Sequence, residues 1–292
     1  MFSPGKTRDG PETGRLPEFF AVGPQRTATT WLYEVLRPHV SMPQGVKETM
    51  FFDRYYHRGL GWYRAHFLHC PPYRPVGEIA PTYFHSEMAT RRLRTYIPRG
   101  KIICTLREPV SRVYSLYLHM RAYGLTNLPF EDALDKCPIL LDSSYYYIHV
   151  RRWLETFDAG NVLVLLNDDL VTEAQEYIAT FCQFIGIEEI DLSKEQRQPI
   201  GRETTARNYL VTRTVNTIAD LLRQQRLYFI INMAKRLGLR RFVFAGGTEL
   251  PRLSAEMRDQ LSAHFRPQIA ELEGLLGRDL SGWRKPAGCE AP

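Results

Sequence analysis

The chain has 292 residues, a length that suits one large α/β unit, and 44% of them are hydrophobic, which is enough for a sizeable core. Its 38 Lys and Arg against 32 Asp and Glu give a formal charge of +6. This mild excess suits an anionic ligand and is too small to indicate nucleic acid by itself. No apolar run approaches the roughly 20 residues of a membrane-spanning helix.

The N-terminal segment 1–17 is rich in Gly, Pro and charged residues and lacks the apolar core of a signal peptide. We therefore expect a disordered lead-in over 1–17, followed by a single domain over 18–292. The five cysteines are scattered and form no Cys-x-x-Cys pair, which favours reduced thiols over a disulfide framework. These features lead us to expect a cytoplasmic protein.

Apolar runs and helical patterns alternate along the chain. The runs predict four buried strands, at Phe19–Val22, Val76–Ile79, Lys101–Leu106 and Asn161–Leu166. Helices are predicted after Pro109, after a capping box formed by Thr172 and Gln175 with a stop at Gly186, and over 250–276 with a stop at Gly277. The alternation predicts an α/β fold with a central parallel sheet flanked by helices.

A polar loop joins the first predicted strand to the first predicted helix. It offers the backbone N–H groups of a helix start to an anion. Arg26 adds a planar cation, and hydroxyl groups come from Thr27, Thr29 and Thr30. The loop predicts a phosphate or sulfate site. It is close to a Walker A motif but differs from it, because Ala28 takes the second Gly position and Thr29 the Lys position.

A second charged loop follows the strand predicted at Lys101–Leu106. Arg107 falls at the carboxyl end of that strand, where open α/β sheets bind ligands. Ser115 lies about two turns into the next helix, so both side chains can converge on one anion. The alternative is an Arg107 salt-bridged at the helix start and a Ser115 on a polar helix face. Arg112 and His119 share that face and are interpreted as solvated or structural.

In combination, the two loops resemble those of the sulfotransferases that use 3′-phosphoadenosine-5′-phosphosulfate. The first loop matches their pattern at all but one position, Ala28, where Gly is usual; the matching residues are Arg26, Thr27, Thr29, Thr30, Trp31 and Leu32. The resemblance implies that residues 26–31 hold the 5′-phosphosulfate in a P-loop-like loop, without a metal. It also implies that Arg107 and Ser115 bind the 3′-phosphate, and that Arg202 belongs to a loop covering the cofactor.

The segment between the two loops resembles the branch of the family that includes heparan sulfate and related bacterial sulfotransferases. Its Lys47-Glu48-Thr49-Met50-Phe51-Phe52-Asp53 stretch implies Glu48 as general base, with Phe51 and Phe52 burying the backbone around it. The branch also implies Lys47, Asp53 and Glu78 as substrate contacts, although Ile79 replaces the Lys that usually follows Glu78. The alternative for Glu48 is a surface carboxylate paired with Lys47.

The segment 208–246 is long, apolar and basic. One interpretation is a helix pair packed on the core with a solvated basic face. The other is a lid or surface, over 223–241, that meets an anionic substrate or membrane headgroups.

The resemblance implies transfer of a sulfuryl group to an acceptor hydroxyl, on a carbohydrate, a lipid-linked molecule or a small natural product, with an amine as the second choice of acceptor. Two alternatives stay open. One is a P-loop kinase of small molecules, which would need the missing Walker Lys and a magnesium-binding Ser or Thr beside it. The other is a non-catalytic anion- or nucleotide-binding protein of the same fold. The histidines show no metal-ligand spacing.

Overall fold

A computed structural model describes residues 14–197, 209–237 and 253–284. Most of the predicted lead-in, residues 1–13, lies outside the described residues, and so does Arg202. The last four residues of the predicted lead-in are packed on the fold. The Arg15 guanidinium donates to the carbonyl oxygens of Pro71 and Arg74 over 2.5 and 2.8 Å.

The centre of the molecule is a parallel sheet of four strands, as predicted. They are β1 (Phe19–Ala21), β2 (Gly77–Ile79), β3 (Lys101–Leu106) and β4 (Val162–Leu166), in the order β2-β1-β3-β4. Phe19 is in register with Gly77 on one side and with Lys101 on the other. Gly77 allows the phenyl ring to cross the strand, because a Cβ there would lie 2.0 Å from Cζ of Phe19.

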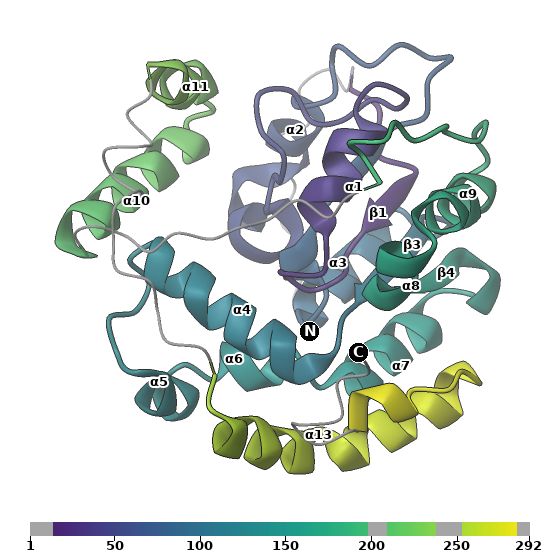
Figure 1. The fold of residues 1–292 in the computed structure, drawn as a ribbon. Coiled ribbons are helices and arrows are strands. Elements are labelled where there is room, and N and C mark those ends of the chain that lie inside the picture. Colours follow the sequence, from purple (N-terminus) through teal and green to yellow (C-terminus); the bar gives the residue numbers. More distant parts are fainter. Residues whose placement is uncertain (1–13, 198–208, 238–252, 285–292) are drawn as a thin grey trace, which may run out of the picture.

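Helices cover both faces of this sheet (Figure 1). The α-helices of the described residues are α1 (Thr29–Leu36), α2 (Gly59–Arg64), α3 (Glu87–Tyr96), α4 (Pro109–Ala122), α5 (Phe130–Lys136), α6 (Ile139–Asp142), α7 (Tyr146–Thr156), α8 (Asn167–Thr172), α9 (Ala174–Ile185), α10 (Tyr209–Gln224), α11 (Tyr228–Arg236) and α13 (Ala255–Leu276); α10 and α11 lie at the edge of the fold, away from the sheet. A π-helix spans Phe51–Tyr55, between α1 and α2.

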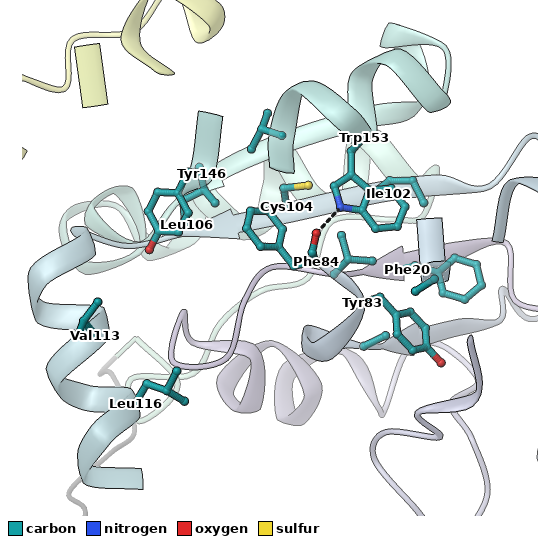
Figure 2. Close-up of a cluster of buried hydrophobic side chains, with 14 of the residues drawn as sticks. Phe20, Tyr83, Phe84, Ile102, Cys104, Leu106, Val113, Leu116, Tyr146 and Trp153 are labelled. Atoms are coloured by element: carbon teal, nitrogen blue, oxygen red, sulfur yellow. Dashed lines mark hydrogen bonds between the residues drawn. The ribbon is translucent and has the colours of Figure 1, made fainter. Parts of the chain in front are cut away.

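Alternate residues of the strands belong to two separate hydrophobic cores, because successive side chains point to opposite faces of a sheet. Phe19, Ala21 and Ile103 pack with α1 and α9 on one face. Phe20, Ile102 and Cys104 pack on the other face with α3, α4, α7 and α13. Figure 2 shows part of this second core, where the indole of Trp153 donates to the Phe84 carbonyl over 3.0 Å.

Most of the predicted helix ends are confirmed. α4 begins at Pro109, and α9 and α13 end at Gly186 and Gly277, whose φ angles of 79° and 61° favour glycine.

The capping box predicted at Thr172 and Gln175 is wrong. Thr172 ends α8, and its hydroxyl donates to the Asp168 carbonyl of its own helix. Gln175 bonds to Ile190 across the loop that follows α9. The Thr172 hydroxyl therefore stays with the preceding turn and does not cap α9.

The segment 208–246 contains the predicted helix pair, α10 and α11; residues 238–246 lie outside the described part. Within the described residues, no helix is long and apolar enough to cross a membrane.

His149, in α7, is a buried neutral imidazole. Its Nε2 lies 2.7 Å from the Asp142 carbonyl, to which it donates, and its Nδ1 accepts from the Arg152 guanidinium over 3.1 Å. Burial lowers the pKa of His149 to about 4, and the positive charge of Arg152 acts in the same direction. Burial has the same effect on His66 and His85. Protonation would place a second cation against Arg152.

We predict that acid destabilises the fold through these histidines. A pKa that is lower in the folded than in the unfolded chain gives stability that is complete above about pH 6.5 and is lost as the pH falls towards 4. For His149 alone the loss at pH 5 should be about 2 kcal/mol. Urea unfolding at pH 7 and pH 5 measures it. His149→Gln, which keeps a donor and an acceptor, should show a smaller loss, and an unchanged pH dependence would contradict the prediction.

Candidate active site

The site lies where the chain changes direction across the sheet. From β1 the chain passes to β2 on one side, and from β2 it crosses to β3 on the other side of β1. The segments that follow β1 and β3 therefore diverge above neighbouring strand ends, which is where open α/β sheets bind ligands. Both loops singled out in the sequence begin at this edge.

The loop after β1 has the backbone of an anion site. Arg26 and Ala28 have φ angles of 79° and 61°, in the left-handed region. This conformation costs a residue with a side chain roughly 1–2 kcal/mol. Ala28 adopts it nevertheless, and so has the backbone conformation expected of the Gly that is usual at this position of the motif. α1 starts at Thr29 without a side-chain cap and without an acidic residue in its first turn. Its first N–H groups are therefore suited to an anion.

Two of the predicted ligand-binding residues, Thr27 and Trp31, have buried side chains that support the loop. The Thr27 hydroxyl is buried, donates to the Pro24 carbonyl over 2.7 Å and lies 2.7 Å from the Thr105 hydroxyl. Gly23 lets the loop approach β3, since a Cβ there would lie 2.0 Å from Oγ1 of Thr105. A ligand can thus meet Thr27 only through its backbone. Trp31 is buried as well and donates from Nε1 to the Gln196 carbonyl over 2.6 Å.

Ser115, in the helix α4 that follows the second loop, contacts the first loop. Arg26 donates from Nε to the Ser115 hydroxyl over 2.9 Å. The carbonyl of Arg107 accepts from the Tyr146 hydroxyl over 2.8 Å, and no carboxylate among the described residues pairs with its guanidinium. Glu108 caps α4 by accepting from the N–H groups at positions 110 and 111. The start of α4 is therefore already capped, and an anion at this loop would have to be held by side chains.

Arg112, interpreted from the sequence as either solvated or structural, has a structural role. Its side chain is fully buried in α4. It donates to the Gln25 carbonyl over 3.3 Å and to the Leu140 carbonyl over 3.0 Å. The hydroxyls of Ser143 and Ser144 accept from it as well. One guanidinium thus ties the first loop to the segment between α6 and α7.

Lys47 places Glu48 next to the first loop. Its ammonium lies 3.0 Å from Oε1 of Glu48 and donates to the Thr30 hydroxyl over 3.1 Å. Thr30 is in the first turn of α1, and both charged side chains are about one-fifth exposed, 24% and 18%. The ion pair considered as the alternative for Glu48 therefore exists, but it lies beside the start of α1 and not on a remote surface.

Glu78 holds the backbone next to Glu48. It is fully buried, and its Oε1 accepts from the N–H and the hydroxyl of Thr49 over 3.0 and 2.5 Å. Its Oε2 accepts from the Tyr63 hydroxyl over 2.7 Å. Burial raises the pKa of Glu78 to about 7. A fully buried carboxyl does not reach an acceptor in this conformation, so its observed role is positioning and not the predicted substrate contact.

Asp53 lies in the π-helix that follows. Its side chain is half-buried and accepts from the Arg54 N–H over 2.7 Å. Burial raises its pKa, and the Thr82 hydroxyl opposes the rise. Phe51 and Phe52 are fully buried, as expected, and the Phe51 ring stacks on Tyr63 with centroids 4.6 Å apart. These aromatic contacts anchor the segment that carries Glu48.

The sequence did not point to the polar partners that support the loops, namely Gln25, Thr105, Ser143 and Ser144. The sequence placed Arg112 on a polar helix face with Ser115 and His119, so it gave no signal that this guanidinium is buried. Within the described ranges, no three His, Cys, Asp or Glu side chains are placed to hold a metal ion.

We predict that Arg112→Met destabilises the fold by about 2–4 kcal/mol. The change leaves buried carbonyl and hydroxyl groups without their donor, at roughly 1–3 kcal/mol for each such group. Arg151→Met is the control, because Arg151 is exposed and its partners, the Glu155 carboxylate and the Tyr147 hydroxyl, lie at the surface. Denaturant unfolding of both variants is the measurement, and equal small losses would show that Arg112 does not support the loop.

Comparison with known proteins gives one family. The model of the sulfotransferase domain matches residues 16–271. Human bifunctional heparan sulfate N-deacetylase/N-sulfotransferase 2 is 33% identical in an alignment of 197 positions that covers 59% of this chain and 22% of that protein. Mouse enzyme 4 of the same name is 26% identical in an alignment of 299 positions that covers 92% of this chain and 31% of that protein. The chain thus spans less than a third of the length of these relatives.

A solved structure agrees with the fold. The sulfotransferase from Alicyclobacillus acidocaldarius superposes with a TM-score of 0.65 at 23% identity, over 93% of this chain and 100% of that one. Because the model of the sulfotransferase domain matches residues 16–271, the chain belongs to the sulfotransferase domain family.

Proposed function

We propose that the protein transfers a sulfuryl group from 3′-phosphoadenosine-5′-phosphosulfate to an acceptor hydroxyl. The observation that carries this proposal is the double contact of Lys47, which joins the Glu48 carboxylate to Thr30 at the start of α1. A carboxylate able to take a proton is thereby held beside a helix start able to bind an anion.

The loop after β1 fits a phosphosulfate. It combines an uncapped helix start, two left-handed residues and the Arg26 guanidinium. When bound, the cofactor supplies an activated sulfuryl group attached to a phosphate leaving group. Arg107 and Ser115, at the neighbouring strand end, are the residues proposed to hold its 3′-phosphate.

The chain's own residues divide the chemistry between them. As the bond from the acceptor oxygen to sulfur forms, Glu48 takes the proton of the acceptor hydroxyl. As the bond from sulfur to the phosphate oxygen breaks, Arg26 and the first N–H groups of α1 bind the charge that collects on the phosphate. Lys47 lies between the Glu48 carboxylate and the start of α1, and Glu78 holds the backbone next to Glu48 through Thr49.

An amine is the second candidate acceptor. It is supported by the names of the relatives, which are N-sulfotransferases. The kinase alternative has less support, because Thr29 occupies the position of the Walker Lys and is buried.

Arg107→Ala is expected to weaken binding of 3′-phosphoadenosine-5′-phosphate by about 10- to 100-fold, since a charge-assisted hydrogen bond contributes roughly 1.5–3 kcal/mol. Adenosine 5′-phosphosulfate, which lacks the 3′-phosphate, should lose much less affinity. Isothermal titration with both ligands measures the difference. Arg91→Ala, at an exposed ion pair of α3, is the matched control. Equal losses for the two ligands would remove Arg107 from the 3′-phosphate site.

Glu48→Gln tests the proposed base. The amide keeps the size and polarity of the side chain but cannot accept the proton, so transfer should fall by about 10²- to 10⁴-fold. Turnover is measured at saturating cofactor with a panel of hydroxyl and amine acceptors, and affinity for the cofactor product is followed in parallel. Glu34→Gln, a partly exposed carboxylate on α1, serves as the control. If Glu48→Gln keeps activity within a few-fold of the parent, another group must take the proton.

A further inference from the structure

The α10–α11 surface stands apart from the two cores. We define it by the exposed apolar side chains of these helices and their connection: Val211, Ile218, Leu221, Leu227, Phe229, Met233 and Leu237. Figure 1 shows α10 and α11 at the edge of the fold, outside the helices that cover the sheet. Phe229, Met233 and Leu237 are 66%, 54% and 68% exposed. Their spacing of four residues places them on one face of α11 and of the turn that follows it.

The opposite side of these helices is fixed to the fold. Tyr228 is buried, and its hydroxyl lies 2.7 Å from Nε2 of His66. The Gln224 carbonyl accepts from the guanidinium of Arg58 over 2.7 Å, and Asn232 donates to the Gly45 carbonyl over 3.2 Å. The exposed apolar face is therefore presented by anchored helices, next to the segment that leads to Lys47 and Glu48.

The charge of residues 209–237 indicates which kind of partner the α10–α11 surface would bind. Residues 209–237 contain five basic residues, Arg213, Arg223, Arg226, Lys235 and Arg236, and one acidic residue, Asp220, a net charge of +4. Arg223 pairs with Asp220, and Arg226 donates to the Ala65 carbonyl, so the excess over these contacts comes from the other three basic residues. A symmetric dimer would bring the same patch of two chains together and oppose like charges. An anionic lipid surface accepts both the apolar side chains and the basic excess.

We propose that the α10–α11 surface binds an anionic membrane surface, with α11 lying in the plane of the interface and its apolar face among the lipid headgroups and upper acyl chains.

Vesicle co-sedimentation tests the proposal with the full chain. We expect binding to vesicles of phosphatidylcholine with phosphatidylglycerol, weaker binding at high salt, and little binding to phosphatidylcholine alone. The triple variant Phe229→Ser, Met233→Ser, Leu237→Ser should lose on the order of tenfold or more in vesicle affinity.

The matched control replaces three exposed apolar residues of other elements, Leu68→Ser, Met88→Ser and Val171→Ser, and should bind like the parent. Circular dichroism and unfolding check that both triple variants fold. Equal vesicle affinity of the two variants, or no binding by the parent, would overturn the proposal. So would a dimer, detected by sedimentation, that only the α10–α11 variant abolishes while vesicle binding stays unchanged.

Discussion

The parallel pairing of β1 with β3 is the constraint on which the site depends. It places the carboxyl ends of two strands side by side, although Ala21 and its partner Ile103 are 82 positions apart in the sequence. Two loops that are remote in sequence thus start from one edge, and Arg26 reaches Ser115. The chain leaves these strands in different directions, and such a point is where open α/β sheets bind ligands.

Three buried polar contacts keep that edge in shape. The hydroxyl pair of Thr27 and Thr105 fixes the loop to β3, and Arg112 holds it from the other side through Gln25. Glu78 fixes the backbone beside Glu48 through Thr49. Buried polar groups are costly when unpaired, so each of these contacts specifies one arrangement of the loop it supports. The left-handed backbone of Ala28 persists within such a frame.

The sheet was predictable because its strands are short apolar runs bounded by polar loops. The position of the site at one edge of the sheet was predictable because parallel strands have their carboxyl ends at the same edge. Arg26 and Arg107 could be placed there from strand ends alone. The contact of Lys47 with Thr30 could not, since it depends on how the segment after α1 folds back. The burial of Glu78 and Trp31 was missed for a related reason: a motif gives the residue type at a position, whereas tertiary packing decides whether its side chain faces a ligand or the core.

The most direct test of the central claim is calorimetric titration of the protein with 3′-phosphoadenosine-5′-phosphate in the presence of a chelator, beside titration with ATP and magnesium. We predict binding of the bisphosphate without any metal, weakened by Arg26→Ala, and no comparable magnesium-dependent binding of ATP. Magnesium-dependent binding of ATP together with no binding of the bisphosphate would contradict the assignment of this edge as a phosphosulfate site.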